Sequence, residues 1–298
     1  MLALWLTLPL SAHISPAEEN SLSDNSSLSE SSAISPDDLP IIGAGVVDGT
    51  SKTPLRLSRH SSYYGVGFNN IFDSYLSPLD YKGPTLVYTH QREGNATWAG
   101  RDMTSMSILA ANTTLASNPA ENGEFWDVDV QWAYGLHRNW LWGDRAQPRL
   151  RLGLGALWGF HLGGTYSTRN GNNPAQGRLA TDLSVSGLAE YRFPLWNRQW
   201  LWRTQLDAPL LGLMFSPRFG QSYYEIFTIE SRPRFYATYP LNAPSMRLLS
   251  TISLPLRHQR FSVGFQVNVR QSDIQELKRH AWNVAFVVGY TRTLNFLD

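Results

Sequence analysis

Pairs of charged side chains occur at alternate positions along this chain of 298 residues. This spacing indicates where charged groups could act together. One residue separates Asp127 from Asp129, and one separates Arg149 from Arg151. Each pair shares one face if the segment is a β-strand, because successive side chains of a strand alternate sides. His137 and His161 also stand at odd-numbered positions, like these charged residues. A His near carboxylates can act as a general base or bind a metal. Since interior histidines are more often simply hydrogen-bonded, we expect no catalytic residue and no metal site.

A second chemical feature is the polar segment 216–244, which combines Tyr and Phe with Arg. This composition suits recognition of sugar rings or lipid headgroups by stacking and charge-assisted hydrogen bonds. The expected ligand-binding residues are Arg218, Tyr223, Tyr224, Arg232, Arg234 and Tyr236. The alternative is a folded cap with a short helix at 223–228 or with two extra strands. The sequence does not identify the extracellular ligand.

Amphipathic strands would position these residues, and the clearest is 149–163, RLRLGLGALWGFHLG. Its even positions are apolar, whereas its odd positions carry Arg, Gly or His, apart from Leu157. Alternation over this length fits a tilted membrane-crossing strand. We predict ten strands, over 62–72, 83–92, 97–113, 123–138, 149–165, 178–193, 199–215, 245–256, 260–271 and 280–296.

The connections between these strands predict an antiparallel up-and-down transmembrane β-barrel, with ten strands or, alternatively, twelve. Short links at 93–96, 139–148, 194–198 and 257–259 take turns with mostly longer loops at 73–82, 114–122, 166–177, 216–244 and 272–279. Six Trp residues fall beside the short links, as an aromatic girdle at one interface would require: Trp98, Trp140, Trp142, Trp196, Trp200 and Trp202. We therefore expect the short links and both termini on the periplasmic side.

The polar faces of these strands must point inward, because an Arg facing lipid at the bilayer midplane costs about 2–4 kcal/mol. Ten charged residues are expected in the lumen: Asp127, Asp129, Arg149, Arg151, Asp182, Glu190, Arg192, Arg203, Asp207 and Arg247. A ten-strand barrel is narrow, so we expect these charges to pair and plug the interior.

Composition supports the same class of protein. No apolar run is long enough for a membrane helix, and there is no Cys for a disulfide or thiolate site. The net charge of +1 gives no reason to expect nucleic acid. Residues 1–12 resemble a secretory signal that lacks its basic region, residues 13–45 form a Ser-rich and acidic linker expected to be flexible, and residues 46–298 form the barrel.

Two loop phrases, YLSPLDYKG at 75–83 and FGQSYYEIF at 219–227, resemble a family of Gram-negative outer-membrane β-barrel proteins catalogued as a domain of unknown function. The closing strand, with Phe296 two residues from the end, is similar to the assembly signal of such barrels. The resemblance extends from about Val46 to the C-terminus. It implies a barrel in the outer membrane and supplies no catalytic residues.

We therefore expect an integral outer-membrane barrel with a structural, surface-binding or limited solute-transport role. Its expected partners are outer-membrane lipid and the barrel assembly machinery, and no cofactor is expected. GxSxG, HExxH and P-loop patterns do not occur in the sequence. An outer-membrane hydrolase, with acidic and His residues at the extracellular rim, is the alternative among enzymes. A soluble β-rich protein with its aromatic faces buried between sheets is the alternative among soluble folds.

Cell fractionation tests the expected location. The protein should partition into outer membranes and migrate differently on gels before and after boiling, as closed barrels do. Extraction without detergent would instead identify the soluble alternative.

Overall fold

The computed structural model describes residues 56–99, 101–143, 148–171, 173–218, 220, 222, 225, 234–256 and 259–296. All of them belong to the compact unit Ile34–Asp298. The signal-like segment and the linker predicted at 1–45 lie outside the described residues.

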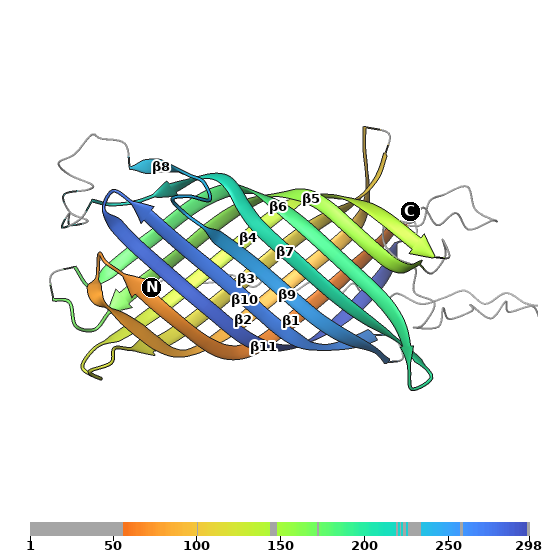
Figure 1. Ribbon diagram of the computed structural model, residues 1–298, viewed down its shortest axis with the longest axis horizontal. Helices are drawn as coiled ribbons and strands as arrows, with labels where there is room; N and C mark the ends of the chain where they lie inside the picture. Colours follow the sequence, from red (N-terminus) through yellow and green to blue (C-terminus); the bar gives the residue numbers. More distant parts are fainter. Residues whose placement is uncertain are drawn as a thin grey trace, which may run out of the picture. The chain divides into compact units, whose positions relative to one another are not determined.

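The described chain is built of long antiparallel strands that tilt around a common axis (Figure 1). Their bounds are β1 Arg56–Asp73, β2 Ser77–Trp98, β3 Arg101–Ser117, β4 Glu124–Gly143, β5 Pro148–Ser167, β6 Ala175–Leu195, β7 Arg198–Phe215, β8 Phe235–Thr238, β9 Ser245–Leu256, β10 Gln259–Ile274 and β11 Leu277–Phe296. Within the described residues, no helix is long and apolar enough to cross a membrane.

Ten of these strands close into a ring. The order is β6-β5-β4-β3-β2-β1-β11-β10-β9-β7, and pairing of β6 with β7 completes it. The first and last strands pair along their whole length, from Arg56 opposite Phe296 to Asp73 opposite Arg279. The short β8 pairs with the end of β7. The predicted all-β, ten-strand barrel is therefore confirmed. Within the described part of the segment 216–244 there is one short strand at the rim, β8, in place of the two that a twelve-strand barrel would need.

The alternation of the sequence sets the two faces of the wall. In β11, Ala281, Asn283 and Ala285 are buried, whereas Trp282, Val284 and Phe286 are exposed by 47%, 54% and 57%. The same pattern along the other strands leaves a broad apolar outer surface. Charged residues on this face, such as Lys82, stand toward the strand ends. The distribution is the one that a hydrocarbon environment selects.

Most strands are longer than the sequence pattern predicts. They contain up to 22 residues, whereas about 9–11 suffice to cross a bilayer. Two predicted loops are consequently wrong, because most of 73–82 and of 272–279 is paired strand. The sequence does not indicate these strand ends because polar residues interrupt the apolar alternation there. Alternate side chains nevertheless point inward, as the buried Tyr81 and Leu277 do.

Tight turns end two of these extended hairpins. Trp196 and Asn197 have φ values of 50° and 57°, and Gln275 and Glu276 have 53° and 66°. Two consecutive positive φ values are typical of type I′ turns, whose twist matches that of paired strands. We refer to the barrel end at the turn 196–197 as the short-turn end, and to the end where β7 leads to β8 as the long-loop end.

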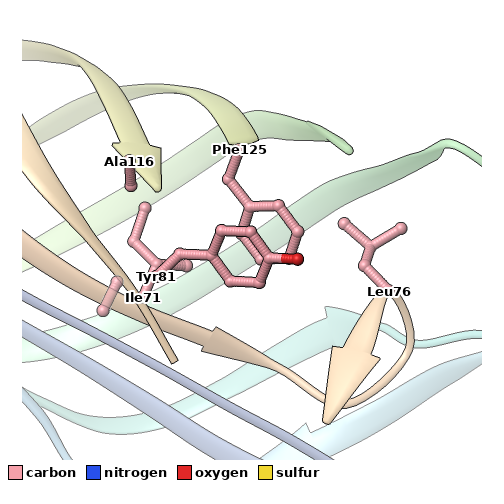
Figure 2. Close-up of a cluster of buried hydrophobic side chains, with 6 residues drawn as sticks. Ile71, Leu76, Tyr81, Ala116 and Phe125 are labelled. Carbon is pink, nitrogen blue, oxygen red and sulfur yellow. The ribbon is translucent and has the colours of Figure 1, made fainter. Parts of the chain in front are cut away.

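Apolar side chains also enter the barrel. Near the long-loop end, a cluster of six residues packs inside β1–β4 and β11, where Tyr81 stacks on Phe125 with ring centroids 3.5 Å apart (Figure 2). Two further interior clusters lie deeper. One contains Tyr63, Val87, Leu249, Ala285 and Val287, and the other contains Met106, Ile108, Ala133, Leu157 and Leu188. The barrel thus has a packed core inside as well as an apolar surface outside.

Arginine substitutions at two depths test the membrane assignment of the outer face. Phe286→Arg, in the middle of β11, should destabilise the barrel in vesicles by roughly 2–4 kcal/mol. Phe261→Arg, near the start of β10, should cost about 0–1 kcal/mol because it lies close to the interface. The readout is reversible unfolding in denaturant, and equal costs at the two positions would argue against immersion in lipid.

Candidate functional site

Five charged side chains gather inside the barrel toward its short-turn end. This inner cluster consists of Arg59 on β1, Glu93 on β2, Arg151 on β5, Glu190 on β6 and Arg203 on β7. Glu93, Glu190 and Arg151 are almost fully buried. Each carboxylate contacts all three guanidinium groups.

The geometry of the inner cluster is that of charge-assisted hydrogen bonds. Arg203 reaches Glu93 at 2.5 Å and Glu190 at 2.6 Å. Arg151 lies 3.2 Å from each carboxylate. Arg59 donates to Glu93 at 2.7 Å and also bonds Glu190. Asn139 and Thr104 accept further hydrogen bonds from Arg151. Such bonds offset part of the desolvation cost of each buried ion.

These ion pairs join opposite walls of the barrel. From β2 to β7 there are five strand steps through β1, β11, β10 and β9, and five through β3, β4, β5 and β6. The contact between Glu93 and Arg203 therefore spans the lumen, and Gln91 donates to Gln205 between the same two strands at 3.0 Å. The contact between Arg59 on β1 and Glu190 on β6 also links opposite strands.

A second group of charges, the outer cluster, lies toward the long-loop end and consists of Asp127, Asp129, Arg178, Arg270 and Arg279. Arg178 is 2.8 Å from Asp127 and 3.3 Å from Asp129. Arg270 on β10 reaches Asp129 on β4, the opposite strand, at 3.4 Å. Ion pairs thus join opposite walls at a second depth along the barrel axis.

Gly163 makes this approach possible. A Cβ atom at Gly163 would lie 2.2 Å from the Asp129 Oδ1 atom and 2.9 Å from the Arg178 Nη2 atom. Any larger residue would displace the ion pair, so the absence of a side chain at this position serves the outer cluster.

A pocket of about 140 Å³ opens beside the outer cluster. Five Lys and Arg side chains and four Asp side chains line it, so it carries one formal positive charge when His161 is neutral. Apolar residues of β7, including Pro209 and Met214, line it as well. Cavities that combine apolar walls with polar groups able to fix the orientation of a ligand are typical of small-molecule sites.

Most of the lumen charges predicted from sequence lie in the interior. Eight of the ten are buried: Asp127, Asp129, Arg151, Asp182, Glu190, Arg203, Asp207 and Arg247. The Arg247 Nε atom donates a hydrogen bond to the Asp207 carboxylate at 3.0 Å. Arg192 is half-buried and lines a cavity of about 20 Å³ with Arg59, Arg203 and Arg260.

Arg149 differs from the expectation. Its side chain is exposed, donates to the Tyr191 hydroxyl at 2.9 Å and lies 5.5 Å from the centre of that ring. The physical reason is local: β4 and β5 shift register between Trp142 and Gly143, so alternation fails in the first residues of β5. At this end of the barrel the Arg149 guanidinium group stacks on the Tyr191 ring and does not depend on a buried carboxylate.

Several partners in the two clusters are missing from the sequence-based set. The sequence pattern places Glu93 in a link, Arg59 before the first strand and Arg279 in a loop, because all three lie beyond the apolar part of their strands. Arg178 and Arg270 lie inside predicted strands. Extending the inward-facing positions of three strands by a few residues would include Glu93, Arg59 and Arg279, whereas Arg178 and Arg270 already stand at inward-facing positions of predicted strands.

The predicted ligand-binding residues are only partly described. Tyr223, Tyr224 and Arg232 lie outside the described residues. Arg218 and Tyr236 are half-buried, and Tyr236 pairs with Met214 in the β7–β8 ladder. Arg234 accepts a backbone hydrogen bond from Ser216 through its carbonyl oxygen at 3.0 Å. The three described residues, Arg218, Arg234 and Tyr236, stand at the long-loop end, next to the pocket-lining end of β7.

Two His residues lie near carboxylates. His161 contacts Asp182 at 2.5 Å inside the barrel, and His280 lies 3.2 Å from Asp80. Asp182 also accepts a hydrogen bond from Ser184 at 2.6 Å. His137 is hydrogen-bonded to Ser186 at 2.8 Å. Within the described residues, no three His, Asp or Glu side chains are placed to hold a metal ion.

Comparison with known proteins identifies a family. The family described as "Protein of unknown function (DUF3316)" matches residues 46–298. This match confirms the resemblance inferred from the loop phrases and covers the same part of the chain. No curated protein matches the chain.

Solved structures with a similar fold are distant in sequence. The transport unit of the autotransporter AIDA-I from Escherichia coli has 10% identity and a TM-score of 0.39, covering 83% of this chain and 93% of that chain. The translocator domain of the autotransporter NalP from Neisseria meningitidis has 10% identity and a TM-score of 0.37, covering 82% and 90%. The toluene transporter TodX from P. putida has 10% identity and a TM-score of 0.19, covering 86% and 92%. These values are too low to transfer any function.

Substitution of one inner carboxylate tests the importance of the inner cluster. Glu190→Gln should destabilise the barrel by roughly 3–5 kcal/mol, because three buried guanidinium groups lose a charged partner. The matched control is Asp273→Asn in the exposed pair with Lys278, at 3.6 Å, which should cost about 0–1 kcal/mol. Unfolding in denaturant measures both, and similar losses for the two variants would contradict this ranking.

Proposed function

The chain belongs to the DUF3316 family, and we propose that it works in the outer membrane as a barrel that binds a small molecule at its extracellular end. We propose further that its own side chains block the lumen, and we call this the closed-bore proposal. In this proposal the long-loop end faces the outside of the cell. Outer-membrane lipid and the barrel assembly machinery remain its proposed partners.

The outer surface supports a membrane location. Large apolar side chains such as Trp158 and Leu154 are exposed by 55% and 53%, and among the described strands no second sheet packs over the ring. Exposed apolar surface of this extent favours contact with lipid, because soluble proteins rarely leave contiguous apolar patches above a few hundred Å². A soluble sandwich would have buried these faces.

The single observation that carries the closed-bore proposal is the set of ion pairs between opposite walls. Glu93 with Arg203 occupies the lumen at one level, and Asp129 with Arg270 occupies it at another. Apolar clusters fill positions in between. A barrel of this strand number has little interior space beyond its side chains. We therefore favour binding over diffusion through a central pore.

The pocket beside the outer cluster supports a binding role. It combines cationic side chains with apolar residues in one cavity. The hydrolase alternative has less support. A nucleophile is activated by a neighbouring base. Ser–His hydrogen bonds join Ser58 to His60, Ser62 to His90 and Ser186 to His137, and all three lie toward the short-turn end. Beside the pocket at the long-loop end, Ser184 is instead hydrogen-bonded to Asp182.

Conductance in planar bilayers tests the proposal. The reconstituted protein should give no ion-conducting steps in concentrated potassium chloride, whereas a general porin reconstituted in the same way should give them. The double variant Arg59→Ala with Arg203→Ala should also stay closed, because the outer cluster blocks the lumen independently. Stable steps from the unmodified protein would overturn the closed-bore proposal, and steps from the double variant would show that the outer level does not seal.

A further inference from the structure

The barrel wall is interrupted between β7 and β9 near the long-loop end. Pairing of β7 with β9 ends at Asp207 opposite Arg247, and pairing of β7 with β8 starts at Gly212 opposite Thr238. On this edge of β7, the four residues 208–211 therefore have no ladder partner in the part of the chain that the structure describes. The facing chain between the two ladders contains the eight residues 239–246, which is four more than β7 supplies.

Three local features prevent β7 and the facing chain from pairing in this gap. Pro209 lies within it and has no N–H to donate to a neighbouring strand. The register of β6 against β7 shifts at the same point, between Leu183 and Ser184. The facing chain instead follows β10, because Asp273 donates a backbone hydrogen bond to the Asn242 carbonyl oxygen at 2.8 Å and Ser245 pairs with Arg270. The gap is therefore flanked by hydrogen-bonded chain on both sides.

The pocket of about 140 Å³ lies at this gap. Arg247, Arg270 and His161 line its polar side. Met214, at an inward position of β7, and Met246, which is 41% exposed on the outer face, line it as well. One cavity thus extends from the charged lumen to the lipid-facing surface of the wall.

The polar side of this pocket has donor capacity that the described chain does not use. Arg247 is 94% buried, and its Nε and Nη2 atoms bond Asp207. Its Nη1 atom has no hydrogen-bond partner among the described residues. A buried guanidinium N–H without a partner carries a desolvation cost that an anionic ligand would relieve.

We propose that this pocket binds the headgroup of a single-chain anionic amphiphile, and that the alkyl chain of this ligand leaves through the gap between β7 and β9 into the bilayer. This inference rests on the proposed binding function and names its ligand class. The anionic group contacts Arg247 and Arg270. The methionine side chains adapt to the chain as it crosses the wall.

The size of the pocket agrees with this class of ligand. An engineered cavity of roughly 150 Å³ takes up benzene, so 140 Å³ holds a headgroup and the first few carbons of a chain. A longer chain fits because the cavity reaches the outer face at Met246. One formal positive charge in the lining matches one anionic group.

Binding of laurate to the full-length protein in a non-ionic detergent tests the proposal by calorimetry. We expect saturable binding of laurate, and binding of dodecanol weaker by about tenfold or more, because the alcohol lacks the charge. Arg247→Gln should weaken laurate binding by about tenfold and abolish the preference over dodecanol. Met214→Trp should abolish binding by filling the pocket without altering the pair of Asp207 with Arg247.

The matched control is Leu213→Trp, which adds the same volume at the neighbouring outward position of β7 and should leave laurate affinity unchanged. Heat-modifiable mobility verifies that each variant is folded. Absence of saturable laurate binding by the unmodified protein, or equal binding by Met214→Trp, would overturn the inference. A barrel that fails to bind laurate but stays non-conducting would leave the closed-bore proposal intact, so the two failures are distinguishable.

Discussion

Moving a carboxylate or a guanidinium group out of water costs several kcal/mol per ion even after the protein relaxes. In this barrel, Glu93 and Glu190 are almost fully buried, and each is stable there because three guanidinium groups surround it. The partners come from strands on opposite sides of the ring. The need to pair buried charges therefore also ties the walls together, and in the proposed closed-bore barrel these same contacts obstruct the lumen.

The wall itself obeys a complementary constraint. Every backbone N–H and C=O in the hydrocarbon region needs a partner, which is why spanning sheets close on themselves. The ten-strand ring meets this requirement along most of its length, and the interruption at 208–211 lies toward the long-loop end. Pro209 lowers the number of unpaired donors there. In the part of the chain that the structure describes, this gap beside a pocket with buried cations lies at the long-loop end.

Much of the fold could be predicted from the sequence, because alternation of apolar and polar residues is a local property. The predicted strand 245–256 coincides with β9, and the ten-strand count is confirmed. The errors arise where alternation weakens. Strand ends outside the apolar band are polar on both faces, so the sequence pattern places Glu93 in a link although it belongs to β2. A register shift turned Arg149 outward. The contacts across the lumen were not predictable, since they depend on strand order and on the depth of each side chain in the ring.

A double-mutant cycle between Glu93 and Arg203 is the most direct measure of contact across the lumen. Glu93→Gln, Arg203→Gln and the double variant are unfolded in lipid vesicles, and their free energies of unfolding are compared with that of the unmodified barrel. Direct contact between opposite walls predicts a coupling free energy of about 1–3 kcal/mol. Effects that add to within about 0.5 kcal/mol would contradict it, because they would show that the two side chains do not interact.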